Sequence, residues 1–186
     1  MTLFDQAAVF SIKVHEGQKR KFSDKPYFLH PMEVAVIAAT MTDDPEILSA
    51  ALLHDSVEDG GVTISEIEER FGKRVAALVR SETEDKMPHV PAAESWLERK
   101  KRTLSMLQNS GDRGVRILWL SDKLSNLRSF VREYRKEGNR MWSRLNQKDR
   151  HMHRWYYSSI LESLEDMKQE DAYLEYRKCF EELFNE

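Results

Sequence analysis

The feature that most constrains this chain is an apolar run that ends abruptly in ionisable residues. From Ile47 to Leu53 the side chains leave almost no polar face, a pattern typical of a helix buried on all sides. The ionisable side chains that follow are His54, Asp55, Glu58 and Asp59. Burying such groups without partners carries a large desolvation cost. We therefore expect a central helix over residues 45–59, whose end meets a metal ion, a cleft or other charged groups.

The rest of the chain also predicts helices. Seven Gly and five Pro among 186 residues are too few for the many turns of an all-β fold. Pro at helix starts, Gly at helix ends and a Thr63/Glu66 capping box place the boundaries. The expected helices span 2–16, 31–42, 45–59, 63–70, 72–84, 91–109, 113–136, 140–145 and 149–184, the last broken near Glu170–Asp171. We predict an all-α class and one compact helical bundle over residues 1–186, with a metal site between its central helices.

Composition excludes several kinds of protein. The single cysteine, Cys179, excludes a disulfide framework and a Cys-rich zinc site. No stretch is long and apolar enough to cross a bilayer, and the N-terminus lacks the pattern of a signal peptide. We expect a cytoplasmic location and no membrane partner.

Two further residues resemble the end of the apolar run in their setting. His30 stands just before Pro31, and Asp122 follows the apolar residues 117–120 and Ser121. With His54 and Asp55 they make two imidazoles and two carboxylates, a donor set that suits manganese, iron(II) or another divalent ion. Taken singly, His30 also fits a helix cap or a core histidine, and Asp122 also fits a buried partner for an arginine.

Two more carboxylates are expected beside these candidates. On a continuous helix, Glu58 lies one turn beyond His54, and Asp59 one turn beyond Asp55. Each would then share a face with a candidate ligand and could orient or deprotonate a metal-bound water. This arrangement indicates hydrolytic chemistry.

Four sequence runs carry a resemblance to a known family. They are residues 26–31 (PYFLHP), 50–59 (AALLHDSVED), 71–79 (FGKRVAALV) and 120–128 (LSDKLSNLR). In order and interval they resemble the HD-domain hydrolase module of the RelA/SpoT family. The likeness is strongest over residues 18–130, and helices in 140–186 are expected to pack on that part. The chain has no room for the family's synthetase domain, so it resembles a stand-alone small alarmone hydrolase.

The resemblance implies a function and a set of site residues. The implied reaction is manganese-dependent removal of the 3′-pyrophosphate from (p)ppGpp, the alarmone of the stringent response, giving GDP or GTP and pyrophosphate. The implied metal ligands are His30, His54, Asp55 and Asp122, and Glu58 and Asp59 would position the attacking water. The implied substrate contacts are Arg20, Lys21, Asn126, Arg128 and Lys100.

Other functions stay open from the sequence. The same centre would serve another nucleotide, such as (pp)pApp, the 2′-phosphate of NADPH or a nucleoside monophosphate. A non-catalytic nucleotide-binding regulator is a further alternative. The net charge of −3 argues against a nucleic-acid partner. It combines an acidic segment, residues 40–85, with a basic one, residues 113–154, which fits a small phosphorylated substrate.

Overall fold

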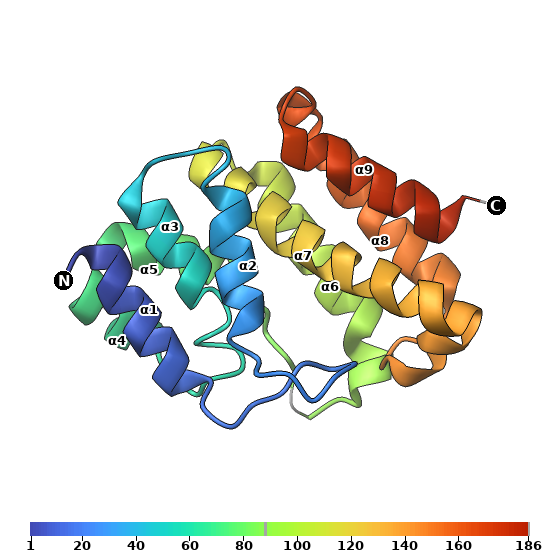
Figure 1. The fold of residues 1–186 in the computed structure, drawn as a ribbon, viewed down its shortest axis with the longest axis horizontal. Coiled ribbons are helices and arrows are strands. Elements are labelled where there is room, and N and C mark those ends of the chain that lie inside the picture. Colours follow the sequence, from blue (N-terminus) through green and yellow to red (C-terminus); the bar gives the residue numbers. More distant parts are fainter. Residues whose placement is uncertain (88, 186) are drawn as a thin grey trace. The chain divides into compact units, whose positions relative to one another are not determined.

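The computed structural model describes residues 1–87 and 89–185 and confirms the all-α class. Among these residues the only strand-like feature is a single bridge between Lys19 and Pro26. None of the described helices is long and apolar enough to span a bilayer. The helices are α1 (Leu3–Val14), α2 (Leu29–Ala38), α3 (Pro45–Leu53), α4 (Ile64–Phe71), α5 (Lys73–Glu82), α6 (Ala92–Asn109), α7 (Arg113–Glu137), η1 (Gly138–Arg144), α8 (Arg150–Ser163), η2 (Glu165–Met167) and α9 (Asp171–Phe184) (Figure 1).

Local sequence signals start several of these helices. Thr2 and Asp5 form a reciprocal capping box at α1, and Asp44 caps α3 just before Pro45. At α4 the Thr63 side chain accepts a hydrogen bond from the Glu66 backbone N–H at 3.2 Å, as the predicted capping box requires. These caps explain why the predicted starts lie close to the observed ones.

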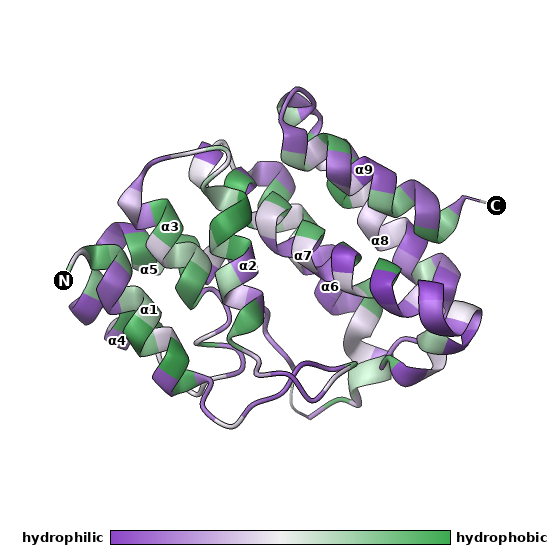
Figure 2. Cartoon of the chain, viewed as in Figure 1, coloured by the Kyte–Doolittle hydropathy of each residue, from purple (hydrophilic) through white to green (hydrophobic). Residues whose placement is uncertain are grey.

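The chain divides into two compact units, and the first contains the apolar run. This unit comprises residues 1–84 and 111–122. At its centre α3 packs against α1, α2 and α5, and residues 50–53 are at most 1% exposed. Figure 2 shows the hydrophobic residues of α2 and α3 in green. The predicted central helix is confirmed, and it places its C-terminal end inside the unit.

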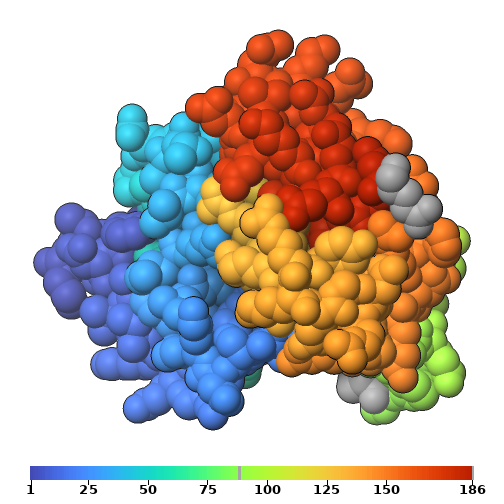
Figure 3. Space-filling view, turned by 45° about the vertical axis from the view of Figure 1, so that its right-hand side comes forward, coloured from blue at the N-terminus to red at the C-terminus, as the bar shows by residue number. Residues whose placement is uncertain are grey.

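The second unit comprises residues 85–110 and the chain from Lys123 onward. Here α8 packs against α6 and α9, and α9 lies at the surface beside α8 (Figure 3). Its core is aromatic: Trp96, Phe130 and Trp142 surround the buried imidazole of His153. The single domain expected over residues 1–186 stays a prediction.

Three predicted helix boundaries are wrong. The helix predicted over 45–59 ends at Leu53, and residues 54–60 form successive turns. The reason lies at Ala51, whose carbonyl oxygen is 2.8 Å from His54 Nδ1. In a continuing helix that oxygen would accept the N–H of residue 55. The imidazole therefore competes with the helix ladder at the point where the helix ends.

The other two corrections concern α2 and the C-terminal segment. Helix α2 begins at Leu29, so His30 lies in its first turn instead of preceding the helix. The helix predicted over 149–184 is broken from Leu164 to Glu170, a wider gap than expected. There Leu164 and Met167 are almost fully buried, and tight turns place both of them in the core.

Candidate metal centre

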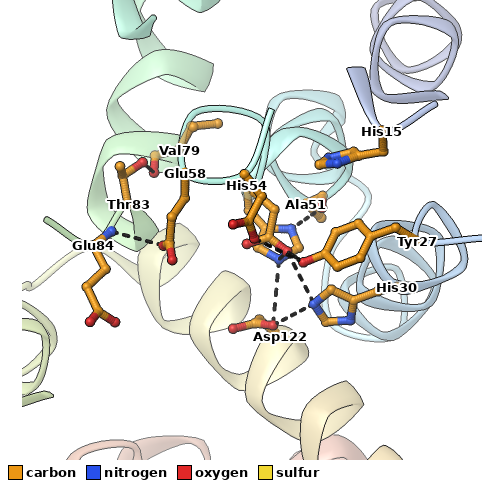
Figure 4. Close-up of polar contacts among 12 residues, drawn as sticks. His15, Tyr27, His30, Ala51, His54, Glu58, Val79, Thr83, Glu84 and Asp122 are labelled. Carbon is orange, nitrogen blue, oxygen red and sulfur yellow. Dashed lines mark hydrogen bonds and ion pairs between the residues drawn. The ribbon is translucent and has the colours of Figure 1, made fainter. Parts of the chain in front are cut away.

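Three separate segments of the first unit bring two imidazoles and a carboxylate together. His30 comes from the first turn of α2, His54 from the C-terminal end of α3, and Asp122 from α7. Their ligand atoms all lie within 4.8 Å of one another, and all three residues are buried (Figure 4). His30 Nε2 is 3.0 Å from Asp122 Oδ1, and His54 Nε2 is 3.6 Å from the same oxygen.

Asp55 completes this cluster from the turn that follows α3. Its Oδ2 atom lies 3.0 Å from His54 Nε2 and 3.5 Å from His30 Nε2. The structure thus brings together all four residues that the sequence predicts as ligands. We call His30, His54, Asp55 and Asp122 the HD cluster.

The hydrogen bonds of His54 suit a bound cation. A carbonyl oxygen can only accept, so the contact with Ala51 places a proton on His54 Nδ1. In the neutral imidazole, Nε2 then presents its lone pair to two carboxylates, and it makes no well-aligned hydrogen bond there. Lone pairs converging in a buried space require a positive charge among them. A divalent metal ion fits this donor set of imidazole nitrogens and carboxylate oxygens.

The pKa shifts in the cluster have the same cause. Burial opposes a charge on His54, but the charge of Asp55 and the close contacts with both carboxylates outweigh it and raise the pKa of His54 well above 6.5. Burial lowers the pKa of His30, against the opposing effect of Asp122. Burial would raise the pKa of Asp55, yet the neighbouring His54 and His30 keep it below its ordinary value. Without a metal ion, the carboxylates therefore hold a proton on an imidazole instead.

The two predicted water-handling carboxylates lie in the turns over residues 54–60, which we call the carboxylate loop. Glu58 Oε2 accepts a hydrogen bond from the backbone N–H of Glu84 at 3.2 Å, as Figure 4 shows. Asp59 Oδ2 lies 3.4 Å from the Tyr27 hydroxyl. Although α3 has ended, the backbone N–H of Asp59 donates to the carbonyl of Asp55, and the Tyr27 hydroxyl contacts both carboxylates, so Asp59 lies on the same side as Asp55. The continuous helix on which the prediction rested is not formed.

Tyr27 is a site residue to which the sequence reasoning assigned no role. Its hydroxyl donates to Asp55 Oδ2 at 2.6 Å, and its ring lies 5.9 Å from that of His30. Burial and the charge of Asp55 raise the pKa of Tyr27, so the hydroxyl stays protonated and remains a donor. The available signal was its position three residues before His30. A tyrosine gives no sign of a ligand contact until the chain is folded.

The predicted basic pair occupies the loop before α2. The guanidinium of Arg20 lies over the ring of Tyr27, 5.7 Å from its centroid. Lys21 follows it and is exposed. This loop is closed by the backbone N–H of Arg20, which donates to the carbonyl of Lys25. Arg20 thus contacts the ring of Tyr27, whose hydroxyl donates to Asp55 of the HD cluster.

The other three predicted substrate contacts belong to the second unit. Asn126 and Arg128 lie on α7, both partly exposed. Arg128 donates from Nε and Nη2 to the two carboxylate oxygens of Glu175, at 2.7 and 2.6 Å. The Lys100 ammonium lies over the ring of Tyr156, 5.1 Å from its centroid. Their predicted role in substrate binding stays a prediction.

Comparison with known sequences places this geometry in a family. The profile of the HD domain family matches residues 7–150. The chain is 38% identical over 135 residues to a guanosine-3′,5′-bis(diphosphate) 3′-pyrophosphohydrolase of Aquifex aeolicus, covering 71% of this chain and 19% of that protein. It is 39% identical over 127 residues to the bifunctional (p)ppGpp synthase/hydrolase SpoT of Escherichia coli, covering 67% and 18%. The chain spans about a fifth of the length of these curated relatives.

Solved structures match over much more of their length. One is described as a metazoan ortholog of SpoT that hydrolyses ppGpp and plays a role in starvation responses. It has a TM-score of 0.76 and 25% identity, covering 97% of this chain and 94% of its own. The crystal structure of lmo0812 from Listeria monocytogenes has a TM-score of 0.73 and 32% identity, covering 84% and 99%. The matched profile includes all four residues of the HD cluster, and the chain therefore belongs to the HD domain family, in its RelA/SpoT-type branch.

Proposed function

We propose that this protein is a divalent-metal-dependent hydrolase that removes the 3′-pyrophosphate of (p)ppGpp, yielding GDP or GTP and pyrophosphate. The observation that carries the proposal is the HD cluster, in which Asp55 joins the three buried residues His30, His54 and Asp122, and whose convergent donors suit a divalent cation. The names of the curated relatives and of the metazoan structure support the choice of substrate. We also propose that both units act as one hydrolase domain, in the cytoplasm.

The metal ion would be held by His30, His54, Asp55 and Asp122, and we propose Mn²⁺ for this mixed nitrogen and oxygen donor set. When bound, a divalent ion supplies Lewis-acid polarisation of phosphate oxygens and lowers the pKa of water. The chain's own contribution begins with Tyr27, whose hydroxyl donates to Asp55 Oδ2 and fixes the direction of that carboxylate.

The carboxylate loop handles the proton in this proposal. Water adds across the bond between phosphorus and the 3′-oxygen, so one proton must leave the water and one must reach the 3′-oxygen. We assign the first transfer to Asp59 Oδ2, because it lies next to the hydroxyl that also bonds Asp55. Glu58, whose carboxylate is oriented by the Glu84 N–H, is assigned to hold the water in place.

The phosphates need cationic partners near this loop. We assign this task to Arg20 and Lys21, which stand in the loop before α2 with Arg20 over the ring of Tyr27. Asn126 is proposed to bind the ribose and base. Lys100 and Arg128 are further candidates for the phosphate side, and their contacts within the second unit set how much each can contribute.

Product analysis tests the function directly. The purified protein is incubated with ppGpp and Mn²⁺, and nucleotides, phosphate and pyrophosphate are separated and quantified. We expect GDP and pyrophosphate in equal amounts, and no turnover after chelation. Release of orthophosphate, or no turnover of ppGpp alongside turnover of ppApp or NADPH, would overturn the proposed reaction.

Substitution of the carboxylate loop separates catalysis from binding. Replacing Glu58 by Gln is expected to leave nucleotide affinity nearly intact and to abolish turnover, because the side chain keeps its shape and loses its charge. Retention of wild-type turnover by this variant would remove the role assigned to Glu58. Unchanged pyrophosphate release by Asp59→Asn would do the same for Asp59.

A further inference from the structure

The C-terminal end of α1 contacts the carboxylate loop through residues that the proposed chemistry does not use. His15 follows the last residue of α1 and is 3% exposed. Its Nδ1 atom lies 2.8 Å from Gln18 Oε1. Gln18 Nε2 in turn donates to the backbone carbonyl of Asp59 at 2.9 Å. Two hydrogen bonds thus connect α1 to a residue 41 positions beyond Gln18.

The donors and acceptors in this connection have only one consistent arrangement. The carbonyl of Asp59 can only accept, so the Gln18 amide must turn its NH₂ group towards it. Its oxygen then faces His15, and that oxygen also only accepts. His15 must therefore carry its proton on Nδ1. The imidazole donates to the amide, and the amide donates to the loop.

Packing reinforces the same contact. A Cβ atom added to Gly60 would lie 2.1 Å from Val14 Cγ1 and 2.5 Å from the carbonyl oxygen of Ser56, so the loop backbone sits directly against α1. The ring of His15 also packs on that of Tyr27, with centroids 4.9 Å apart, as Figure 4 shows. The end of α1 therefore contacts the backbone of the carboxylate loop and the ring that orients Asp55.

We propose that His15 and Gln18 are positioning residues that hold the Asp59 carboxylate in its working place. This inference rests on the function proposed above, because it takes Asp59 as the group that handles the proton. Within the loop, Asp59 N donates to the Asp55 carbonyl and Gly60 N to the Ser56 carbonyl. The bond from Gln18 joins the carbonyl of Asp59 to the end of α1 from outside the loop.

The expected kinetic effect follows from where the hydrogen bonds of His15 and Gln18 end. The two hydrogen bonds end on the backbone of Asp59 and on no member of the HD cluster. Loss of these hydrogen bonds is expected to lower kcat about 10-fold and to change KM by less than about threefold. Effects of this size are typical of residues that orient a functional side chain without touching the substrate. Affinity for Mn²⁺, measured by calorimetry, is expected to stay within about threefold of wild type.

The variants are chosen in matched pairs. Gln18→Met keeps the length of a half-exposed side chain and removes both hydrogen bonds. His15→Asn keeps an N–H donor near Nδ1, whereas His15→Leu has nearly the same shape and no donor. We expect Gln18→Met and His15→Leu to lose kcat, and His15→Asn to keep more of it than His15→Leu. Wild-type kcat in Gln18→Met, or equal kcat in the two His15 variants, would overturn the proposal.

A control separates positioning from general stability. Ser49→Ala removes a buried hydrogen bond from the Ser49 hydroxyl to the Pro45 carbonyl, in the helix that leads to the same loop. We expect this variant to lower Tm and to leave kcat unchanged. If Ser49→Ala lowers kcat as much as Gln18→Met does, the effect of Gln18 is merely structural and the proposal is wrong.

A second readout does not depend on the substrate. Amide hydrogen exchange over residues 54–62 is measured on metal-free protein by mass spectrometry. We expect faster exchange in Gln18→Met than in wild type, and no change in Ser49→Ala. If wild type releases no pyrophosphate from ppGpp, the proposed function fails while the exchange data still test whether Gln18 holds the loop. Unchanged exchange in Gln18→Met would overturn this role of Gln18 whatever the substrate.

Discussion

The HD cluster and the basic residues of the second unit differ in how their charges are satisfied inside the protein. His54 Nε2 faces two carboxylates without a well-aligned hydrogen bond, in a buried space. Arg128 makes two short hydrogen bonds to Glu175, and Lys100 lies on the ring of Tyr156. The first arrangement presents convergent nitrogen and oxygen donors that suit a divalent cation. The second has partners supplied by its own unit.

This difference in contacts shows that the HD cluster is stronger evidence for a function than Arg128 or Lys100. A buried cluster of ionisable groups carries a desolvation cost, so its donor set is strong evidence for a bound cation. An exposed ion pair costs little and contributes little, so it is compatible with many functions. We therefore expect the largest effects in the HD cluster and much smaller ones at Arg128.

The largest effect is expected from Asp122→Asn. This variant removes one charge from the donor set and keeps the shape of the side chain. Substitution of a residue that hydrogen-bonds to a metal ligand typically lowers metal affinity about 10–100-fold. Loss of a ligand itself should therefore lower metal affinity more than about 100-fold. Isothermal titration calorimetry with Mn²⁺ measures it, and Glu175→Gln serves as the control with unchanged affinity. Wild-type Mn²⁺ affinity in Asp122→Asn would show that Asp122 is not a ligand.

The next effect is expected at Tyr27. Tyr27→Phe removes the hydroxyl that donates to Asp55 Oδ2 and keeps the ring beside His15 and His30. We expect metal affinity or kcat to fall about 10–100-fold, as for other groups that orient a ligand. Tyr173→Phe is the matched control, because its hydroxyl donates to a backbone carbonyl in the second unit. Equal behaviour of the two variants in both assays would contradict this role.

A smaller effect is expected at Arg128. Arg128→Ala breaks the pair with Glu175, whose members are 30% and 44% exposed, so the free energy of unfolding should fall by about 1 kcal/mol or less. We expect KM for ppGpp to rise less than about threefold, since much of the guanidinium is already engaged. Urea unfolding and steady-state kinetics measure the two quantities. A KM rise above tenfold with unchanged stability would place Arg128 with the substrate instead.

The smallest effect is the pH dependence of the same pair. The hydrogen bonds from Arg128 lower the pKa of Glu175 below its ordinary value of 4.5. When the folded-state pKa is lowered, the contribution to stability is complete above the ordinary, unfolded-state pKa and is lost as the pH falls through the folded-state pKa. We expect the stability difference between wild type and Glu175→Gln to shrink from pH 7 towards pH 3.5 in urea titrations. A difference that grows on acidification would have the wrong sign for this pair.

The sequence predicted which four residues come together, because His54, Asp55 and Asp122 stand at the end of apolar runs and His30 at the start of an apolar helix. Their role as metal ligands stays a prediction. Burial of those runs forces His54 and Asp122 into the interior of the first unit. The C-terminal end of α3 could not be predicted from the sequence. It depends on a hydrogen bond from His54 Nδ1 to the Ala51 carbonyl, which exists only after the ring takes its rotamer. The continuous helix predicted through Glu58 and Asp59 was wrong for that reason.

Partners distant in the chain escaped the sequence for a different reason. The residues around Arg128 do not predict its contact with Glu175, which lies 47 residues further on. Those around Gln18 do not predict its bond to the carbonyl of Asp59. Such contacts depend on how helices pack, and helix periodicity alone does not fix packing. Tyr27 belongs to the same group, because its hydroxyl reaches Asp55 only once α2 and α3 are side by side.

The bond between His54 and Ala51 also bears on how freely this protein can evolve. A substitution of His54 would disturb both the end of a core helix and the donor set. Asparagine can bond a backbone carbonyl but is too short to reach the carboxylates in the same way, and alanine does neither. Position 54 is therefore constrained by folding and by chemistry at once, so new substrates would be acquired through changes elsewhere, around a centre that stays as it is.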